Sequence, residues 1–346
     1  MDALVPALVP ASDRGGPAQP LLTATGLRKH FPVLGGLLGR TTKVVRAVDD
    51  LSLSIAKGET LGVVGESGCG KSTVARLLIR LIKPDLGSMV LDGDPVDEPH
   101  GITVNELRRQ VQMVFQDSYA SLNPRLTIVE TLAFAPKAHG VPAAEARARS
   151  RDLLAKVGLD PNSFADRYPH ELSGGQRQRV NIARALALQP RLVILDEAVS
   201  ALDKSVEAQV LNMLVDLKSE LGLTYLFISH DLNVVQYLSN RVLVMYLGKI
   251  VEIGDVDAIY GNPLHPYTRA LLSARPSMNP RQRTQEAPIQ GDPPNPIDPP
   301  SGCRFRTRCP FAEDVCAKAE PILTDTGAQE VACHMRVRNS GHTKAP

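Results

Sequence analysis

Short runs of apolar residues alternate with helical stretches from Leu21 to about Asp257. Runs in which every position is apolar are typical of strands in a sheet that is covered on both faces. The pattern therefore predicts an α/β core around a buried sheet. The clearest predicted strands are Leu61–Val64, Val111–Phe115, Leu192–Leu195, Tyr225–Ile228 and Val242–Tyr246.

The stretch between the second and third of these strands is predicted to be entirely helical. Its best helix follows Pro142, which suits a first helical position, and ends before Gly158, which suits a C-cap. We interpret the residues from about 117 to 184 as a helical subdomain inserted into a domain that spans residues 21–260.

Two segments lack any periodic pattern. Residues 1–20 are rich in Ala, Pro and Gly and are predicted to form a disordered tail. The segment Gln290–Pro300 is dominated by proline and predicts a semi-extended linker. It leads into a cysteine-bearing tail, so residues 261–346 are predicted to form a small C-terminal extension.

Composition narrows the class of protein. Hydrophobic residues make up 43% and charged residues 22%, and the apolar runs are far shorter than the roughly 20 residues of a membrane span. No leader pattern opens the chain, so we expect a cytosolic location with any membrane role acting through partner chains. The net charge of +2 comes with interspersed acids and bases, so no nucleic-acid partner is expected.

A glycine-rich segment follows the first predicted strand and fits the pattern G-x-x-x-x-G-K-[ST]. Backbone N–H groups of such a loop point at a phosphate, and the next helix adds its positive dipole end. Lys71 is then expected to reach the β- and γ-phosphates, and the Ser72 hydroxyl to bind Mg²⁺. A chance match is disfavoured because the segment lies between a predicted strand and a predicted helix, Ser72–Ile82. The predicted nucleotide-binding residues are Gly65, Glu66, Ser67, Gly68, Cys69, Gly70, Lys71, Ser72 and Thr73.

The strand Leu192–Leu195 ends in two adjacent acids, Asp196 and Glu197. Ligands of such sheets gather at the carboxyl ends of the strands. Asp196 is expected to hold Mg²⁺, and Glu197 to act as the general base on the attacking water. Such a pair alone is more often a solvated strand end, so this interpretation depends on the phosphate loop.

A second helix start has the composition of an anion site. Leu172 precedes Ser173, Gly174, Gly175 and Gln176, and Ser173 is a good N-cap. Because the chain already has its own phosphate loop, this site is expected to contact a γ-phosphate bound by another chain.

The LSGGQ segment together with both nucleotide motifs resembles the ABC-type ATPases. This resemblance covers residues 21–260 and implies a RecA-like P-loop NTPase core with an antiparallel β subdomain and the inserted helical subdomain. It implies ATP hydrolysis with Mg²⁺, in which Lys71, Glu197 and His230 are catalytic and Gln116 also approaches Mg²⁺. It further implies that Asp203 crosses the dimer interface. Phe31 is similar to the aromatic residue that stacks on adenine, although the predicted loop Val33–Lys43 beside it is long.

Three stretches are similar to the F-type ATPases of oligopeptide and dipeptide importers: Met113–Arg125, Asp196–Asp203 and Asn262–Leu272. This resemblance implies an ATPase on the cytoplasmic face of the membrane that energises peptide import. Its implied partners are a second, D-type ATPase subunit, two permease subunits and an extracytoplasmic binding protein. Nickel and glutathione importers share the subfamily, and a soluble ABC ATPase outside transport is a further alternative.

The tail carries Cys303, Cys309, Cys316 and Cys333. Four thiolates can hold Zn²⁺ or an iron–sulfur cluster, but the spacing matches neither the zinc-ribbon nor the ferredoxin pattern. Spacing alone therefore leaves four free thiols as an alternative. The run Gly302–Pro310 resembles the tail of peptide-import ATPases that carry a [4Fe–4S] cluster, which implies such a cluster, with Zn²⁺ second. The arginines at positions 304, 306 and 308 are expected to offset its negative charge.

Overall fold

A computed structural model describes residues 16, 18–35, 40–275 and 291–346. Most of the predicted tail, and all of residues 276–290, therefore lie outside the described residues. The chain divides into two compact units, and it passes between them several times. Unit 1 comprises residues 1–22, 55–59 and 90–228, and unit 2 comprises residues 23–54, 60–89 and 229–346.

Unit 1 contains three parallel strands of the central sheet, β6 (Val111–Val114), β7 (Leu192–Asp196) and β8 (Thr224–Ile228). Every residue of β7 and β8 is buried. A strand covered on both faces needs apolar side chains at successive positions, so the predicted apolar runs are confirmed as strands.

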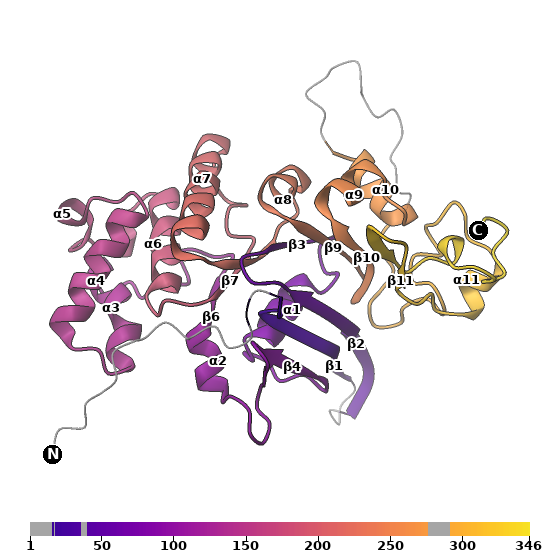
Figure 1. Ribbon diagram of the computed structural model, residues 1–346, viewed down its shortest axis with the longest axis horizontal. Helices are drawn as coiled ribbons and strands as arrows, with labels where there is room; N and C mark the ends of the chain where they lie inside the picture. Colours follow the sequence, from indigo (N-terminus) through magenta and orange to yellow (C-terminus); the bar gives the residue numbers. More distant parts are fainter. Residues whose placement is uncertain (1–15, 17, 36–39, 276–290) are drawn as a thin grey trace. The chain divides into compact units, whose positions relative to one another are not determined.

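The stretch between β6 and β7 is helical, as predicted, and Figure 1 shows its helices grouped together. The helix predicted after Pro142 is confirmed, although the proline itself is the N-cap residue. Ala146 and Leu154 of that helix are fully buried. The elements between β6 and β7 are α3 (Ile128–Ala138), α4 (Ala143–Lys156), α5 (Pro161–Phe164), the 3₁₀ turn η1 (Pro169–Glu171) and α6 (Gly174–Leu186). Unit 1 also holds β5 (Asp94–Pro95), α2 (Val104–Gln110) and α7 (Lys204–Leu221).

The sheet strands of unit 2 come from distant parts of the chain. β3 (Thr60–Val64) runs parallel to β9 (Arg241–Tyr246), and β9 pairs antiparallel with β10 (Lys249–Asp255). β10 then pairs with β12 (Gln329–Val331), which pairs with β11 (Thr324–Asp325). The C-terminal extension thus adds two strands to the sheet that contains β3.

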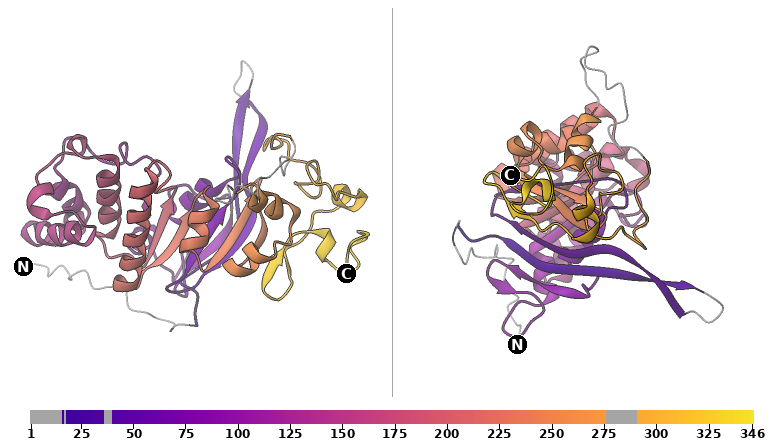
Figure 2. Two further views of the ribbon diagram at one scale, coloured as in Figure 1. Left: turned by 90° about the horizontal axis from the view of Figure 1, so that it is seen from above. Right: turned by 90° about the vertical axis from the view of Figure 1, so that its right-hand side faces the viewer.

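Unit 2 also carries two long neighbouring strands, β1 (Leu22–Gly35) and β2 (Arg40–Ile55), which lie side by side in Figure 2. They belong to a second sheet with β4 (Leu86–Leu91), and β4 pairs antiparallel with β5. The loop predicted over Val33–Lys43 is therefore wrong at both ends, since strand structure continues to Gly35 and resumes at Arg40. The β-rich pattern of these residues lets the chain continue its ladder.

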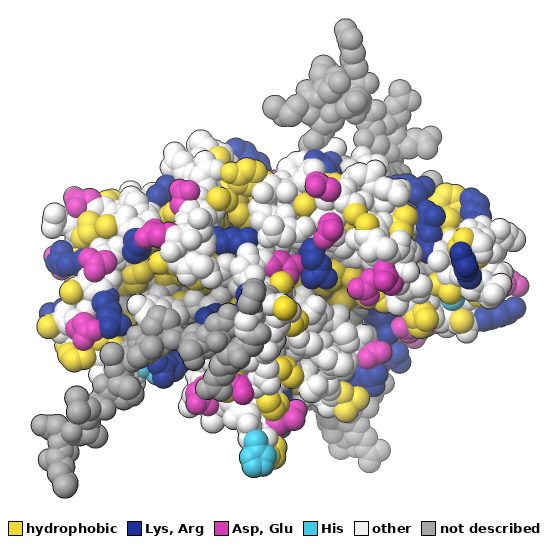
Figure 3. All heavy atoms as spheres, viewed as in Figure 1, with side chains coloured by type: hydrophobic (Ala, Val, Ile, Leu, Met, Phe, Trp, Pro, Cys, Tyr) yellow, Lys and Arg dark blue, Asp and Glu magenta, His cyan; other side chains and the backbone are white. Residues whose placement is uncertain are grey.

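The remaining elements of unit 2 are short helices. The first of them is shorter than the predicted Ser72–Ile82, because Arg80 adopts a left-handed φ of 54° that a helix cannot continue through. None of the described helices is long and apolar enough to cross a bilayer. On the face in Figure 3, acidic and basic side chains are interspersed. The helices are α1 (Lys71–Leu78), α8 (Leu232–Leu238), α9 (Val256–Gly261), α10 (Pro266–Ser273), α11 (Asp314–Lys318) and the 3₁₀ turn η2 (His334–Arg336).

Candidate nucleotide-binding site

The phosphate loop in unit 2 connects the buried strand β3 to α1 through three glycines with positive φ. A Cβ atom at Gly65 would lie 2.3 Å from the carbonyl oxygen of Met245, and one at Gly70 would lie 2.2 Å from that of Ala47. Both positions therefore require glycine for steric as well as conformational reasons. The loop is therefore fixed closely against β9 and β2.

Lys71 is the first residue of α1 and is buried. Its ammonium donates hydrogen bonds to the carbonyl oxygens of Gly65 at 2.7 Å and Glu66 at 3.1 Å. The positive charge is thus held at the loop that precedes it, where an anion would be bound. Cys69 is also buried, and burial raises the pKa of its thiol.

In unit 1 the structure brings together two predicted residues, Gln116 and Glu197. The Gln116 side-chain amide donates to Glu197 Oε2 at 2.8 Å. Glu197 has a left-handed φ of 50°, and its N–H donates to the carbonyl oxygen of Ile228 at 2.9 Å. A non-glycine residue in this region costs about 1 kcal/mol or more, and such outliers concentrate at functional sites. Asp196, the last residue of β7, is buried beside it.

The predicted second anion site starts α6. Ser173 Oγ accepts from the N–H of Gln176, and Gln176 Oε1 accepts from the N–H of Ser173, which completes a capping box. A Cβ atom at Gly174 would meet open space, whereas one at Gly175 would lie 2.4 Å from Val206 Cγ1. The turn is therefore closed on its α7 side and open at Gly174. Asp203 is the N-cap residue of α7.

The remaining predicted residues lie in unit 2. His230 is exposed and follows β8, and Asp231 after it caps α8. Phe31 lies on β1 with its side chain 36% exposed, and the Lys29 ammonium is 5.6 Å from its ring centroid. The predicted set thus divides between the units: the phosphate loop, Phe31 and His230 in unit 2, and Gln116, the acidic pair, Ser173–Gln176 and Asp203 in unit 1.

Sequence reasoning missed two residues that hold the phosphate loop. The Tyr267 hydroxyl accepts from the N–H of Glu66 at 2.8 Å, and Arg308 forms an ion pair with the Glu66 carboxylate. Both belong to stretches that the sequence singles out for their likeness to importers. Neither stretch carries a local signal that points to residue 66, because the partners are more than 200 positions apart in the chain.

The four cysteines of the tail all line one cavity of about 20 Å³. Burial raises the pKa of Cys303 to about 12 and that of Cys333 to about 11, and it also raises that of Cys309. These thiols are therefore protonated near neutral pH. Within the described ranges, no group of three or more His, Cys, Asp or Glu side chains is arranged to hold a metal ion. The four thiols thus share one cavity, but among the described residues they do not form a ready-made set of metal ligands.

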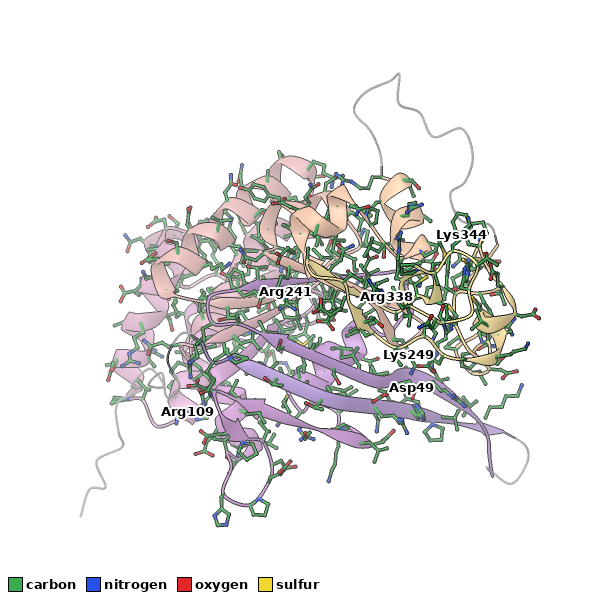
Figure 4. All side chains as sticks on the ribbon, turned by 45° about the vertical axis from the view of Figure 1, so that its right-hand side comes forward. Asp49, Arg109, Arg241, Lys249, Arg338 and Lys344 are labelled. Carbon is green, nitrogen blue, oxygen red and sulfur yellow. The ribbon has the colours of Figure 1, made fainter. Side chains whose placement is uncertain are left out.

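The arginines of the tail have partners other than those expected. The guanidinium of Arg304 pairs with Asp49 and donates to the carbonyl oxygen of Leu247, while Arg306 donates to the carbonyl oxygen of Ser301. Burial alone raises the pKa of Asp49, but Arg304 and Lys249 lower it overall; Figure 4 shows Asp49 near Lys249. Arg304 and Arg308 are thus each paired with a carboxylate of unit 2.

Two family models match the chain. The ABC transporter model matches residues 48–200, and the model of the oligopeptide/dipeptide transporter C-terminal region matches residues 251–316. The oligopeptide transport ATP-binding protein AppF of Bacillus subtilis is 48% identical over 91% of this chain and 97% of its own length. The dipeptide transport ATP-binding protein DppF of Escherichia coli is 48% identical over 91% of this chain and 94% of its own length.

Solved structures give the same picture of the fold. The structure of cbiO1 from Clostridium perfringens, part of the ABC transporter complex cbiONQ, is 27% identical with a TM-score of 0.60, and covers 70% of this chain and 91% of its own. An ATP-binding cassette solved as a dimer in a post-hydrolysis state with ADP and Pi is 28% identical with a TM-score of 0.59. It covers 68% of this chain and 98% of its own. A P-loop NTPase core of the predicted class is thereby confirmed.

Proposed function

Because this chain belongs to the ATP-binding proteins of the oligopeptide/dipeptide ABC transporters, and is thus an ABC-type ATPase, we propose that it is the F-type subunit that energises import of di- and oligopeptides. One observation carries this proposal: a single chain matches both the ABC transporter model and the peptide-transporter C-terminal model. The second match separates it from ABC ATPases at large.

The proposed roles follow from the residues of each unit. Lys71 reaches the β- and γ-phosphates of ATP, and Phe31 stacks on the adenine. The side-chain oxygens of Ser72, Gln116 and Asp196 are of the kind that Mg²⁺ prefers, so they fit the cation, which supplies charge neutralisation on the phosphates. Glu197 accepts the proton of the attacking water. The hydrogen bond from Gln116 to its carboxylate supports a held base, since a general base must be fixed within reach of its proton.

ATP is proposed to be bound between two ATPase subunits. Ser173, Gly174, Gly175 and Gln176 of one subunit contact the γ-phosphate held by the other, with Asp203 at the interface and His230 on the γ-phosphate. The open space at Gly174 and the capped helix start support this contact. The dimeric relative with ADP and Pi supports a two-subunit arrangement.

The proposed partners are a D-type ATPase subunit, two permease subunits and an extracytoplasmic peptide-binding protein. The chain is then a peripheral subunit on the cytoplasmic face of the membrane. ATP binding drives closure of the two ATPase subunits, because the γ-phosphate makes its contacts in the closed arrangement and not in the open one.

We keep the tail cysteines as a proposed metal site, with [4Fe–4S] ahead of Zn²⁺. Its support is the convergence of four thiols on one cavity and the fit of thiol sulfur to either group. The test is anaerobic purification with quantified iron, sulfide and zinc. Four iron and four sulfide per chain support the cluster, zinc alone replaces it, and a metal-free chain ends the proposal.

The experiment that tests peptide import is uptake of labelled di- and oligopeptides, with nickel in parallel, in cells that carry wild-type or Glu197→Gln protein. Loss of peptide uptake in the variant supports the proposed function. Loss of nickel uptake with unchanged peptide uptake replaces the cargo, and no change in either contradicts both the peptide and the nickel assignment.

A further inference from the structure

The C-terminal extension reaches the phosphate loop through Arg308. Its guanidinium donates two hydrogen bonds to the Glu66 carboxylate, from Nη1 to Oε2 at 2.7 Å and from Nη2 to Oε1 at 3.0 Å. The Arg308 side chain is 7% exposed and the Glu66 side chain 23%, so the pair is partly shielded from water. Two parallel bonds from a planar guanidinium fix both the position and the orientation of a carboxylate.

Glu66 is held at its backbone as well. Its N–H donates to the Tyr267 hydroxyl at 2.8 Å, and its carbonyl oxygen accepts from the Lys71 ammonium at 3.1 Å and from the N–H of Cys69 at 3.2 Å. The second residue of the phosphate loop thus links the loop's own lysine to two side chains of the chain's last 80 residues. A displacement of Tyr267 or Arg308 would be transmitted directly to the loop.

Arg308 offsets the negative charge that the Glu66 carboxylate places in the phosphate loop. A negative charge in an anion-binding loop repels an approaching phosphate, most strongly where water is excluded. Arg308 neutralises that charge, and the hydrogen bonds to Glu66 raise the pKa of the guanidinium. The pair therefore favours phosphate binding through its charge and through the fixed position of the loop.

Buried aromatic side chains next to Arg308 hold it in place. The rings of Tyr246, Tyr267 and Phe305 pack with centroids 4.7 to 5.4 Å apart, and all three are at most 2% exposed. Arg308 also lies over the Tyr246 ring, 6.0 Å from its centroid. Arg304, which precedes Phe305 in the chain, forms an ion pair with Asp49 of β2. Buried aromatic contacts of this kind keep a side chain in one rotamer.

We propose that Arg308 and Tyr267 are positioning residues for ATP: the C-terminal extension clamps Glu66 and so sets the phosphate loop for nucleotide binding. This inference rests on the proposed function only in that the ligand is ATP. It concerns binding and not cargo, and it assigns the extension a role at the nucleotide site of its own chain.

The test is the dissociation constant of Mg-ATP for the purified full-length chain, measured by calorimetry. Arg308→Ala should weaken binding about tenfold, since a buried charge left without its partner is costly. Arg306→Ala is the matched control, because Arg306 lies in the same run and, among the described residues, donates to Ser301 and not to Glu66. Glu66→Gln in the Arg308→Ala background should recover most of the affinity, because it removes the uncompensated charge.

Equal affinities of Arg308→Ala and Arg306→Ala would overturn the clamp while leaving the ATPase assignment in place. Failure of the wild-type chain to bind ATP would instead defeat the proposed function itself. Should Arg308→Ala not fold, Arg308→Lys supplies the test, since it keeps the charge but loses the two-bond geometry, and about threefold weaker binding is then expected. Melting temperatures without nucleotide separate a loss of folding from a loss of affinity.

Discussion

The phosphate loop of unit 2 and the Ser173–Gln176 turn of unit 1 both start a helix at a predicted anion site, yet they are held differently. Ser173 and Gln176 satisfy each other within three residues. The phosphate loop depends on distant groups: Gly248, whose N–H donates to the Cys69 carbonyl oxygen, and the side chains of Tyr267 and Arg308. One site is stabilised by its own sequence, and the other by a scaffold built from the far end of the chain.

The largest expected effect separates binding in unit 2 from turnover in unit 1. Glu197→Gln should lower ATP turnover by about 100-fold or more, because the general base is lost, and leave Mg-ATP affinity within about twofold. Steady-state phosphate release and calorimetry measure the two quantities. Glu98→Gln, an exposed acid elsewhere in unit 1, is the control. Near-normal turnover would remove Glu197 from the mechanism.

A pair of identical substitutions sharpens the contrast in scaffolding. Gly70→Ala should lower the free energy of unfolding by about 3 kcal/mol, because the new methyl meets a backbone oxygen at 2.2 Å and the residue has a φ of 110°. Gly174→Ala has open space and should change it by only about 0.5 kcal/mol, in the stabilising direction.

Urea unfolding of both variants measures this difference. Similar stabilities of the two would show that the phosphate loop is no more constrained than the turn before α6.

Acid should weaken the phosphate-loop scaffold before the other site. His265 caps α10, which carries Tyr267, and complete burial lowers the pKa of His265 to about 3. The folded pKa lies below the unfolded value of about 6.5, so this stability is present above pH 6.5 and is lost as the pH falls. At pH 5 the loss is about 2 kcal/mol.

His265→Asn keeps a capping oxygen and should remove this part of the pH dependence. Glu252, whose pKa burial raises, accepts from the N–H of His265 and acts in the opposite sense, so the difference between variant and wild type isolates the histidine. Urea unfolding at pH 7.5 and pH 5 gives that difference. Parallel pH profiles of the two proteins would contradict the assignment.

The smallest effect tests local stabilisation. Ser173→Ala removes one half of the capping box and should cost about 1 kcal/mol of unfolding free energy. Ser173→Asp, which can still cap, should recover most of it, and thermal unfolding measures both. A cost near zero would mean that packing against α7, not the cap, holds this turn.

Much of the core could be predicted because its strands and helices are specified by the residues within each element. Strands β3, β7, β8 and β9 lie where continuous apolar runs predict them, and α4 lies where proline and glycine delimit it. The end of α1 was predicted wrongly, because no glycine or proline marks the position at which Arg80 adopts a left-handed backbone conformation. The strand ends on either side of residues 36–39 were also missed, since the loop was predicted over Val33–Lys43.

The candidate site shows the same division. Residue types and spacing alone identify the phosphate loop, the acidic pair and Ser173–Gln176, because each motif satisfies its chemistry over a few consecutive residues. The bond between Gln116 and Glu197 is a different matter, since it joins residues 81 positions apart.

The sequence by itself determined the local motifs of this protein: a phosphate loop, an acidic pair and a capped helix start, each formed by neighbours in the chain. Only the tertiary structure decided that β11 and β12 of the extension join the sheet of β3, and that Arg308 pairs with Glu66. The physical reason is that local hydrogen bonding depends on adjacent residues, whereas the pairing of distant groups depends on which buried surfaces pack together.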